Sequence, residues 1–357
     1  MTDAPNATAG APLLQVKGLK KHFAMSKPFL NRLLEGGETQ TVKAVDGLDL
    51  EIPRGKTLSL VGESGCGKST VARLIMGLSN PTGGRIVFDG TDISRAPAGQ
   101  PAAIRRRMQM IFQDPYASLN PRWRVGDIIA EPLRTYGLCE TREAERREVD
   151  RLLEFVGLNA KDGDKFPHEF SGGQRQRISI ARAISTKPEF LVCDEPTSAL
   201  DVSVQAQILN LMREMQRELG LTYLFISHDL AVVNFMSDWI GVMYLGRLVE
   251  VSPAAELFAN PRHPYTRLLL DTIPDLDMSK RDRQPVAGEV PNPINPPTGC
   301  HFHPRCPLAN DRCRREAPAL RVYDGDARAS CHAAEEGRDA TAIAAQVPVA
   351  RPHQAAV

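Results

Sequence analysis

The residues best suited to chemistry lie in one stretch, Gly62-Glu63-Ser64-Gly65-Cys66-Gly67-Lys68-Ser69-Thr70. The spacing fits the pattern G-x-x-x-x-G-K-[ST], in which glycines let the backbone curl until several N–H groups point at one centre. Lys68 adds a positive charge for the outer phosphates of a nucleotide, and the Ser69 hydroxyl suits a Mg²⁺ ion. The alternative is a glycine turn that only starts a helix. The pattern favours a phosphate-binding loop.

Such a loop needs a strand before it and a helix after it, because the phosphate rests on the helix N-terminus. The sequence supplies both elements. The apolar run Thr57–Val61 is typical of a buried strand, and Val71–Gly77 is typical of the first turns of a helix. The local context therefore supports the phosphate-loop interpretation.

Two adjacent carboxylates, Asp194 and Glu195, end another apolar run that begins at Phe190. An aspartate at a strand end beside a phosphate loop suits a Mg²⁺ site. Glu195, which strand alternation would turn to the other side, can polarise a water against a γ-phosphate. The alternative is an ordinary strand end.

Three further polar groups follow or begin expected elements. Gln113 follows the predicted strand Met108–Phe112 and could touch both a magnesium ion and an attacking water; alone it would be a surface amide. His228 follows a strand over 222–226 and could hold the γ-phosphate; alone it would be a structural histidine. Ser171 to Gln174 offers a second helix start that admits an anion, or only an N-cap.

Strand and helix patterns alternate along most of the chain. Further strands are expected at 14–23, 45–52, 85–88, 240–244 and 248–251, and a helix at 204–219. The pattern from Gly126 to about Leu158 is helical and rich in charged pairs at helix spacing, which indicates an inserted helical subdomain. The prediction is an α/β fold with the ligand loops at strand ends.

The overall composition of the chain argues against several classes of protein, namely nucleic-acid-binding, membrane-spanning and secreted proteins. The 357 residues carry 44 Lys+Arg against 43 Asp+Glu, a net charge of +1, which argues against a nucleic-acid partner. No run approaches the roughly eighteen apolar residues that would cross a bilayer, and Met1–Gly10 lacks the features of a secretory signal. A reducing cytoplasm is therefore expected, and the seven cysteines are expected to be inert or metal-bound rather than disulfide-bonded.

In this order and spacing, the motifs resemble those of the ATP-binding subunit of ABC transporters, over roughly Leu13 to Val251. The resemblance implies a Walker A loop at Gly62 to Thr70, a Q-loop glutamine, a Walker B strand with a catalytic carboxylate, a signature, a D-loop and a switch histidine. The ATP contacts would be Phe23, through adenine stacking, Gly62, Glu63, Ser64, Gly65, Cys66, Gly67, Lys68, Ser69 and Thr70. The catalytic residues would be Glu195, His228 and Gln113, and the Mg²⁺ ligands Ser69, Gln113 and Asp194. The signature would be Ser171, Gly172, Gly173 and Gln174, preceded by Phe170 where leucine is commoner, and the D-loop would end at Asp201.

The same resemblance implies the domain organisation. Residues 1–12 and 335–357 are expected to be disordered, and 13–255 to form the ATPase domain with the helical subdomain at about 114–186. A cysteine- and proline-rich extension would occupy 256–334. The insert at 24–41 carries Phe29, Leu30, Leu33 and Leu34, and its role is open between a surface loop and a membrane- or partner-facing hairpin. ATP would lie between the loop of one subunit and the signature of another, so that closure of the dimer is the power stroke.

Three longer stretches narrow the resemblance to the oligopeptide and dipeptide importer ATPases, of the second paralogue type. They span Met110–Arg122, His168–Arg177 and Gly299–Pro307. The implied partners are a paralogous ATPase, two membrane permease subunits at the cytoplasmic membrane face and, indirectly, an extracytoplasmic peptide-binding protein. Nickel and glutathione importers share much of the pattern. An ABC ATPase that acts in DNA repair is disfavoured because no long coiled coil is inserted, and one that acts in translation because the chain has a single cassette. A stand-alone nucleotide-binding regulator is disfavoured because the catalytic set is complete.

Four of the cysteines cluster near the C-terminus: Cys300, Cys306, Cys313 and Cys331. Thiolates are soft ligands, and a tetrahedral zinc site, with His301, His303 or His332 as substitute ligands, fits this set. A four-iron [4Fe-4S] cluster fits equally on ligand type, and the resemblance to peptide-importer ATPases favours it. Free or oxidised thiols are the third alternative. Cys66, Cys139 and Cys193 are expected to be packing or loop residues.

Overall fold

A computed structural model describes residues 11–25, 40–94, 102–271, 289–323 and 326–338. The predicted insert at 24–41 and the predicted disordered ends lie largely or wholly outside these ranges. In the described residues, no helix is both long and apolar enough to cross a membrane.

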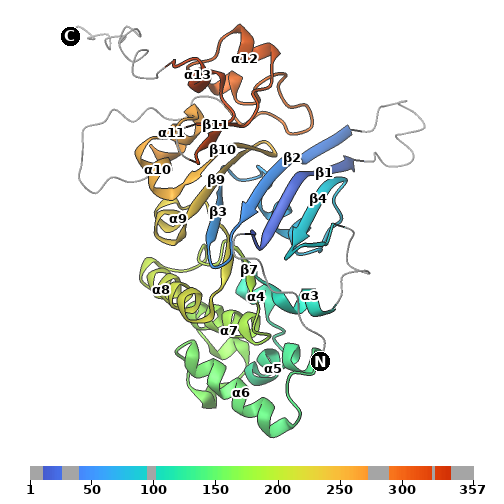
Figure 1. Ribbon diagram of the computed structural model, residues 1–357. Helices are drawn as coiled ribbons and strands as arrows, with labels where there is room; N and C mark the ends of the chain where they lie inside the picture. The colour runs from blue at the N-terminus through green and yellow to red at the C-terminus, as the bar shows by residue number, and fades with distance from the viewer. Residues whose placement is uncertain (1–10, 26–39, 95–101, 272–288, 324–325, 339–357) are drawn as a thin grey trace, which may run out of the picture.

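An eight-stranded mixed sheet forms the centre of the structure (Figure 1). Its spatial order is β11-β12-β10-β9-β3-β8-β7-β6. The neighbouring strands from β6 to β9 are parallel, and β10, β12 and β11 continue the sheet antiparallel. The strands are β3 (Thr57–Val61), β6 (Met108–Ile111), β7 (Phe190–Asp194), β8 (Thr222–Ile226), β9 (Trp239–Tyr244), β10 (Arg247–Pro253), β11 (Arg321–Val322) and β12 (Arg328–Ala329). The predicted α/β class is confirmed.

A second sheet, which the sequence pattern did not separate from the first, is antiparallel and has the order β2-β1-β4-β5. Its strands are β1 (Leu14–Met25), β2 (Gln40–Ile52), β4 (Gly83–Phe88) and β5 (Thr91–Asp92). The strands expected at 14–23, 45–52 and 85–88 exist, but they pair with one another. Alternation identifies a half-buried strand without identifying its neighbours, so the sequence could not assign these strands to a separate sheet.

Residue alternation decides what packs on each face of the main sheet. Phe190 and Val192 of β7 face the core shared with the antiparallel sheet and α2 (Lys68–Ile75). Leu191 and Cys193 face the core shared with the helices. Because both faces are covered, β3, β7 and β8 are buried at every position, which explains their predominantly apolar sequences.

Helices fill the lower end of the molecule in Figure 1, where the sequence predicted the helical subdomain. The helices α5 (Val125–Thr135), α6 (Arg142–Phe155), α7 (Gly172–Ile184) and α8 (Val202–Leu219) contribute to one apolar core. The other helices are α3 (Ala102–Arg107), α4 (Pro115–Ser118), α9 (Leu230–Met236), α10 (Ala254–Ala259), α11 (Pro264–Leu270), α12 (Asp311–Arg315), α13 (His332–Glu335) and the short 3-10 turns at 160–164, 167–169 and 303–305.

The residues after β10 pack back onto the sheet. Glu250 of β10 is buried, and its carboxylate accepts hydrogen bonds from the N–H groups of Arg262 and His263 at 2.9 and 2.8 Å. The ring of His263 caps α11, because its Nδ1 accepts the N–H of Tyr265 at 3.0 Å. Burial lowers the pKa of His263 to about 3, so the ring is neutral and acts as an acceptor.

This buried histidine predicts a pH dependence of stability. Its folded pKa lies below the value of 6.5 for an unfolded chain, so its contribution to folding is present above pH 6.5 and is lost as the pH falls toward about 3. In His263→Asn the amide oxygen can still cap the helix but does not titrate. The free energy of unfolding of the variant should therefore fall less steeply in acid, by up to about 1.4 kcal/mol per pH unit. Urea unfolding at a series of pH values measures the two slopes, with exposed His168→Asn as control. Equal slopes for wild type and His263→Asn would contradict the prediction.

Candidate functional site

The phosphate loop is positioned by β3 and α2. The left-handed backbone of Gly67, with φ of 109°, ends the loop and starts the helix. A Cβ atom at this position would lie 2.2 Å from the carbonyl oxygen of Ala44 on β2, so both the conformation and the space require glycine. The Val71 N–H donates to the Gly67 carbonyl at 3.0 Å and closes the first turn.

The Lys68 side chain folds back over the loop that precedes it. Only 6% of the residue is exposed, and Nζ donates to the carbonyl oxygens of Gly62 at 2.7 Å and Glu63 at 3.1 Å. These acceptors satisfy the buried ammonium and hold it inside the curve of the loop. The arrangement places a positive charge where the outer phosphates of a nucleotide would lie.

Ser69 and Asp194 meet across the start of α2 and the end of β7. The Ser69 hydroxyl donates to Oδ1 of Asp194 at 3.0 Å. Burial of Asp194, opposed by this hydrogen bond and reinforced by the charge of Glu195, raises the pKa of the carboxyl. A hydroxyl and a carboxylate side by side are the oxygen ligands that Mg²⁺ prefers, so this pair could hold the ion.

Glu195 lies where three strand ends converge. Its Oε2 accepts a hydrogen bond from Nε2 of Gln113 at 3.0 Å and lies 3.3 Å from Nδ1 of His228. The three residues follow β6, β7 and β8, which are parallel neighbours, so their carboxyl ends share one edge of the sheet. The structure thus brings together all three sequence-predicted catalytic candidates, and their arrangement can hold and polarise a water molecule.

The backbone at Glu195 differs from the predicted strand alternation. Strand alternation was expected to turn it away from Asp194, but its φ is +48°, in the left-handed region. The Glu195 N–H still donates to the Ile226 carbonyl of β8 at 2.9 Å, and its own carbonyl accepts the N–H of Ser198. The chain therefore leaves the strand at Glu195 in a turn, and this turn directs the carboxylate.

The predicted signature starts α7. Ser171 and Gln174 form a capping box, in which the Ser171 hydroxyl accepts the Gln174 N–H and the Gln174 side chain accepts the Ser171 N–H. Gly173 is required by close packing, because a Cβ atom there would lie 2.3 Å from Cγ1 of Val204. Asp201, at the end of the predicted D-loop, caps α8 by accepting the Val204 N–H at 3.0 Å. The start of α7 is therefore packed against the first turn of α8.

Phe23 leaves a ring face available for stacking. The residue is 44% exposed and its ring contacts Nζ of Lys21, which lies 5.0 Å from the ring centroid. An exposed aromatic face is able to stack on a base.

Two residues that sequence analysis did not connect with the loop also contact it. Tyr265 of α11 and Arg305 of the 3-10 turn His303–Arg305 both hydrogen-bond Glu63. Arg305 lies in the stretch Gly299–Pro307 that carries part of the family resemblance, but 242 residues separate it from Glu63, so no local sequence pattern predicts the contact.

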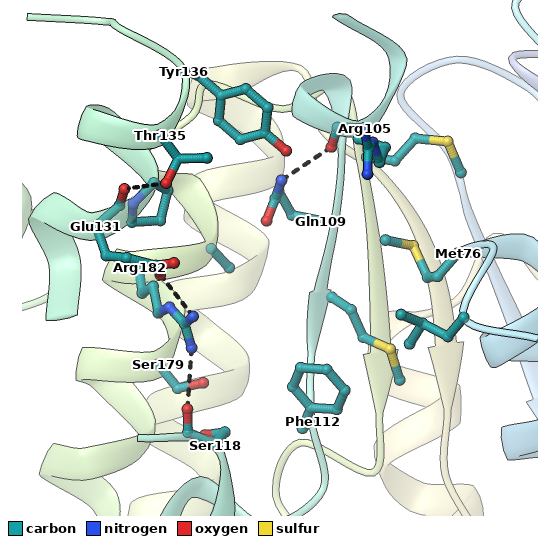
Figure 2. Close-up of a pocket in the computed structure, with 15 residues that line it drawn as sticks. Met76, Arg105, Gln109, Phe112, Ser118, Glu131, Thr135, Tyr136, Ser179 and Arg182 are labelled. Atoms are coloured by element: carbon teal, nitrogen blue, oxygen red, sulfur yellow. Dashed lines mark hydrogen bonds and ion pairs between the residues drawn. The ribbon is translucent and has the colours of Figure 1, made fainter. Parts of the chain in front are cut away.

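A groove of about 290 Å³ lies between the sheet and the helical subdomain (Figure 2). Phe112 and Met76 line one side, and Thr135 and Arg182 the other. The Arg182 guanidinium donates to the Ser118 carbonyl and to the Glu131 carboxylate, at 3.0 and 2.8 Å, so the polar wall of the groove is fixed. Its apolar wall ends at the exposed side chains of Phe112 and Leu78.

The four C-terminal cysteines are free thiols in one region of the fold. The Cys300 N–H donates to the Cys313 carbonyl at 2.8 Å, and Cys306 packs in a small cluster with Leu308 and Cys331. Burial raises the pKa of Cys300 to about 11 and that of Cys306 to about 12, so these thiols are protonated when no metal is bound. Among the described residues, no three His, Cys, Asp or Glu side chains converge as ligands of one metal ion.

Two of the histidines near these thiols each have one ring nitrogen beside a backbone carbonyl oxygen. His303 Nδ1 lies 2.9 Å from the Cys300 carbonyl oxygen, and His332 Nε2 lies 3.1 Å from that of Glu316. Burial lowers the pKa of His301 to about 4. Cys66 and Cys193 are buried packing residues, and Cys139 is partly buried against the helical core, as expected.

Comparison with known proteins identifies two families along the chain. Residues 45–198 match the ABC transporter family, and residues 249–313 match the family described as oligopeptide/dipeptide transporter, C-terminal region. The Bacillus subtilis protein YkfD is 50% identical over 324 residues, which cover 90% of this chain and 95% of that protein. The oligopeptide transport ATP-binding protein AppF of B. subtilis is 47% identical, with 90% and 97% covered. The di/tripeptide transport ATP-binding protein DppF of Pseudomonas aeruginosa is 46% identical, with 91% and 98% covered.

Solved structures agree with these sequence matches. A dimeric post-hydrolysis state of the ATP-binding cassette MJ0796, bound to ADP and Pi, has 26% sequence identity and a TM-score of 0.59, with 68% of this chain and 98% of that chain covered. The protein cbiO1 of Clostridium perfringens, part of the ABC transporter complex cbiONQ, has 29% identity and a TM-score of 0.58, with 70% and 92% covered. The fold is therefore that of the ABC nucleotide-binding subunits.

Proposed function

Because this chain belongs to the family of ATP-binding subunits of ABC oligopeptide and dipeptide transporters, we propose that it hydrolyses ATP to energise the import of short peptides through a membrane permease. The observation that carries the proposal is the contact of Glu195 with Gln113 and His228 beside the Ser69–Asp194 pair. The C-terminal family match supports a peptide rather than nickel or glutathione as the cargo.

The residues of the site divide the work of hydrolysis. The loop N–H groups and Lys68 would bind the phosphates, and Phe23 would stack on the adenine. Ser69, Asp194 and Gln113 would ligate Mg²⁺, which when bound offsets the charge of the outer phosphates. Glu195 would orient the attacking water, with His228 beside it on the side of the γ-phosphate. Gln113 touches Glu195 and could therefore report occupancy of the phosphate site to the helical subdomain.

A second subunit would complete the site. Ser171 and Gln174 are exposed at the start of α7, and the related cassette MJ0796 has a dimeric structure. The signature of this chain would cover the nucleotide on a paralogous ATPase, and the signature of that partner would cover the nucleotide here. Small residues and a helix N-terminus suit a close approach to phosphate.

The groove in Figure 2 is proposed as the docking site for the permease. It lies beside Gln113, and it joins apolar side chains that are exposed in the free subunit to a fixed polar wall. A short helix of a membrane subunit, with apolar residues on one face, fits these features. The chain would then work at the cytoplasmic face of the membrane, below two permease subunits.

A [4Fe-4S] cluster held by Cys300, Cys306, Cys313 and Cys331 is proposed for the C-terminal extension. Four thiols gathered in one region provide the donor set, and a cluster supplies four separate irons instead of one ion. Each of the four cysteines would therefore ligate one iron of the cluster. When bound, a cluster supplies a one-electron redox centre and a cross-link between the four segments.

Removing the negative charge of Glu195 tests the catalytic assignment. Glu195→Gln keeps the shape and the contact with Gln113 but cannot polarise water, so steady-state ATP hydrolysis should fall by about 10²- to 10⁴-fold. ATP binding should persist, and the closed dimer should accumulate with the paralogue. Phosphate release and size-exclusion chromatography measure these effects, with the exposed Glu214→Gln as matched control. An unchanged hydrolysis rate would remove Glu195 from this role.

A charge placed on the rim of the groove tests permease docking. Leu78 is 58% exposed at this rim, so Leu78→Asp should fold but oppose an apolar helix. Less permease should co-purify with the variant, and uptake of a labelled peptide should fall at least severalfold. Leu219→Asp, at the exposed end of α8, is the control for an added surface charge. Normal co-purification of Leu78→Asp would place the docking site elsewhere.

Iron content decides between the metals proposed for the cysteines. The full chain, purified without oxygen, is expected to contain about four irons and to absorb visible light. Cys306→Ser and Cys313→Ser should lose this iron, and Cys139→Ser should keep it, because Cys139 lies in the helical region. Zinc without iron would support the single-ion alternative, and neither metal would leave the four thiols free.

A further inference from the structure

We propose that Tyr265 and Arg305, which lie outside the ABC cassette match, position the phosphate loop through Glu63 and thereby set its affinity for ATP. The inference rests on the proposed function in one respect, that this loop binds ATP. It assigns a task to the C-terminal region matched as oligopeptide/dipeptide transporter, which contains both residues.

The contact between Arg305 and Glu63 is bidentate. The two terminal guanidinium nitrogens donate to the two carboxylate oxygens, each at 2.8 Å. The Arg305 side chain is 4% exposed, and the Glu63 side chain 25%. A planar, two-bond pair that is partly buried fixes orientation as well as distance. The pair therefore holds the Glu63 side chain in one place.

Tyr265 holds the backbone of the same residue. Its phenolic oxygen accepts the Glu63 N–H at 2.8 Å. The ring is fully buried and meets Tyr244 and Phe302, with ring centroids 4.8 and 5.4 Å apart. Aromatic packing of this kind leaves the phenol little freedom to move. Glu63 is thus fixed at both its side chain and its N–H by residues from the C-terminal region.

The remaining polar group of Glu63 faces the active lysine. Its carbonyl oxygen accepts Nζ of Lys68 at 3.1 Å and the N–H of Cys66 at 3.3 Å. A shift of Glu63 would therefore move an acceptor of the phosphate-binding ammonium. This geometry connects Arg305 to Lys68 through one residue.

The contact between Arg305 and Glu63 also neutralises a negative charge. Glu63 places a carboxylate in a loop that must accept a polyanion, and an unpaired carboxylate there would repel the phosphates. Arg305 offsets that charge. Loss of Arg305 should consequently be worse for ATP binding than loss of both members of the pair, which distinguishes positioning and charge compensation from a merely structural contact.

The segment that carries Arg305 also carries two of the cysteines. Arg305 ends the 3-10 turn His303–Arg305, with Cys300 before the turn and Cys306 directly after it. The Cys300 carbonyl accepts the His303 N–H at 3.0 Å. The cysteine-bearing loop is thus in direct contact with the ATP site through its arginine.

The test compares nucleotide binding and turnover in the purified full chain. In Arg305→Met the KM for ATP and the Kd for a fluorescent ATP analogue should rise by roughly 2- to 30-fold, the range of couplings carried through packed networks. The value of kcat should change less, because Glu195 is untouched. Adding Glu63→Gln to Arg305→Met should recover part of the affinity. Tyr265→Phe, which removes the acceptor of the Glu63 N–H, should weaken binding by a smaller factor.

Controls separate this proposal from the proposed function. Arg312→Met makes the same change in the same region at a residue that pairs with Glu316 and Glu336, and it should leave the Kd unchanged. Lys68→Ala should abolish ATP binding; retained binding would overturn the assignment of the loop itself. Loss of binding in Lys68→Ala with wild-type Kd in both Arg305→Met and Tyr265→Phe would overturn only the positioning role. If Arg305→Met does not fold, a wild-type Kd in Tyr265→Phe overturns the proposal, and a raised Kd there supports it.

Discussion

The hydrogen bond from Ser69 to Asp194 joins the phosphate loop to the carboxylates at the end of β7. The order and direction of the strands in the main sheet make this bond possible. Ser69 lies in the first turn of the helix after β3, and Asp194 ends β7, with β8 between the two strands. Parallel pairing of these strands brings their carboxyl ends to one edge, so groups that are distant in the sequence meet without any long loop. Gln113 and His228 reach Glu195 by the same rule, through β6 and β8. An antiparallel arrangement of the same strands would divide these groups between opposite edges.

This arrangement buries charged side chains, which is energetically unfavourable unless they are paired. Lys68 and Asp194 are both nearly inaccessible to water, and each depends on a few specific partners. Lys68 uses backbone carbonyls of its own loop, so its partners are present before any ligand arrives. Asp194 has one hydroxyl partner beside a second carboxylate, and its raised pKa shows that the site disfavours the negative charge. A bound cation would relieve this destabilisation, which is the electrostatic state expected of a site prepared for a metal-bound nucleotide.

The sequence was sufficient to predict those features that depend on interactions between residues close together in the chain. The glycine loop between strand and helix, the Ser171 cap and the strands that lead to Asp194 and His228 depend on a few consecutive residues, and all are found as predicted. The separate antiparallel sheet was not predicted, because alternation does not name a strand's neighbours. The left-handed turn at Glu195 was not predicted either, since the preceding pattern is that of a strand. The Glu63–Arg305 pair depends on how the C-terminal region folds back, which no local pattern contains.

That return of the chain follows from a short series of contacts that begins in the main sheet. The buried carboxylate of Glu250 on β10 binds two N–H groups at the turn before α11, and His263 in that turn caps the helix through the Tyr265 N–H. Tyr265 then accepts the N–H of Glu63. Glu250, His263 and Tyr265 are buried, and their polar groups would be left unsatisfied if a neighbour moved, so the position of Tyr265 is determined from both sides. Hydrogen bonds of buried polar groups therefore connect the residues after β10 both to β10 and to the phosphate loop. A positioning role for the C-terminal region requires such support, because a site residue is held in place only when the groups that contact it are themselves fixed by packing and hydrogen bonds.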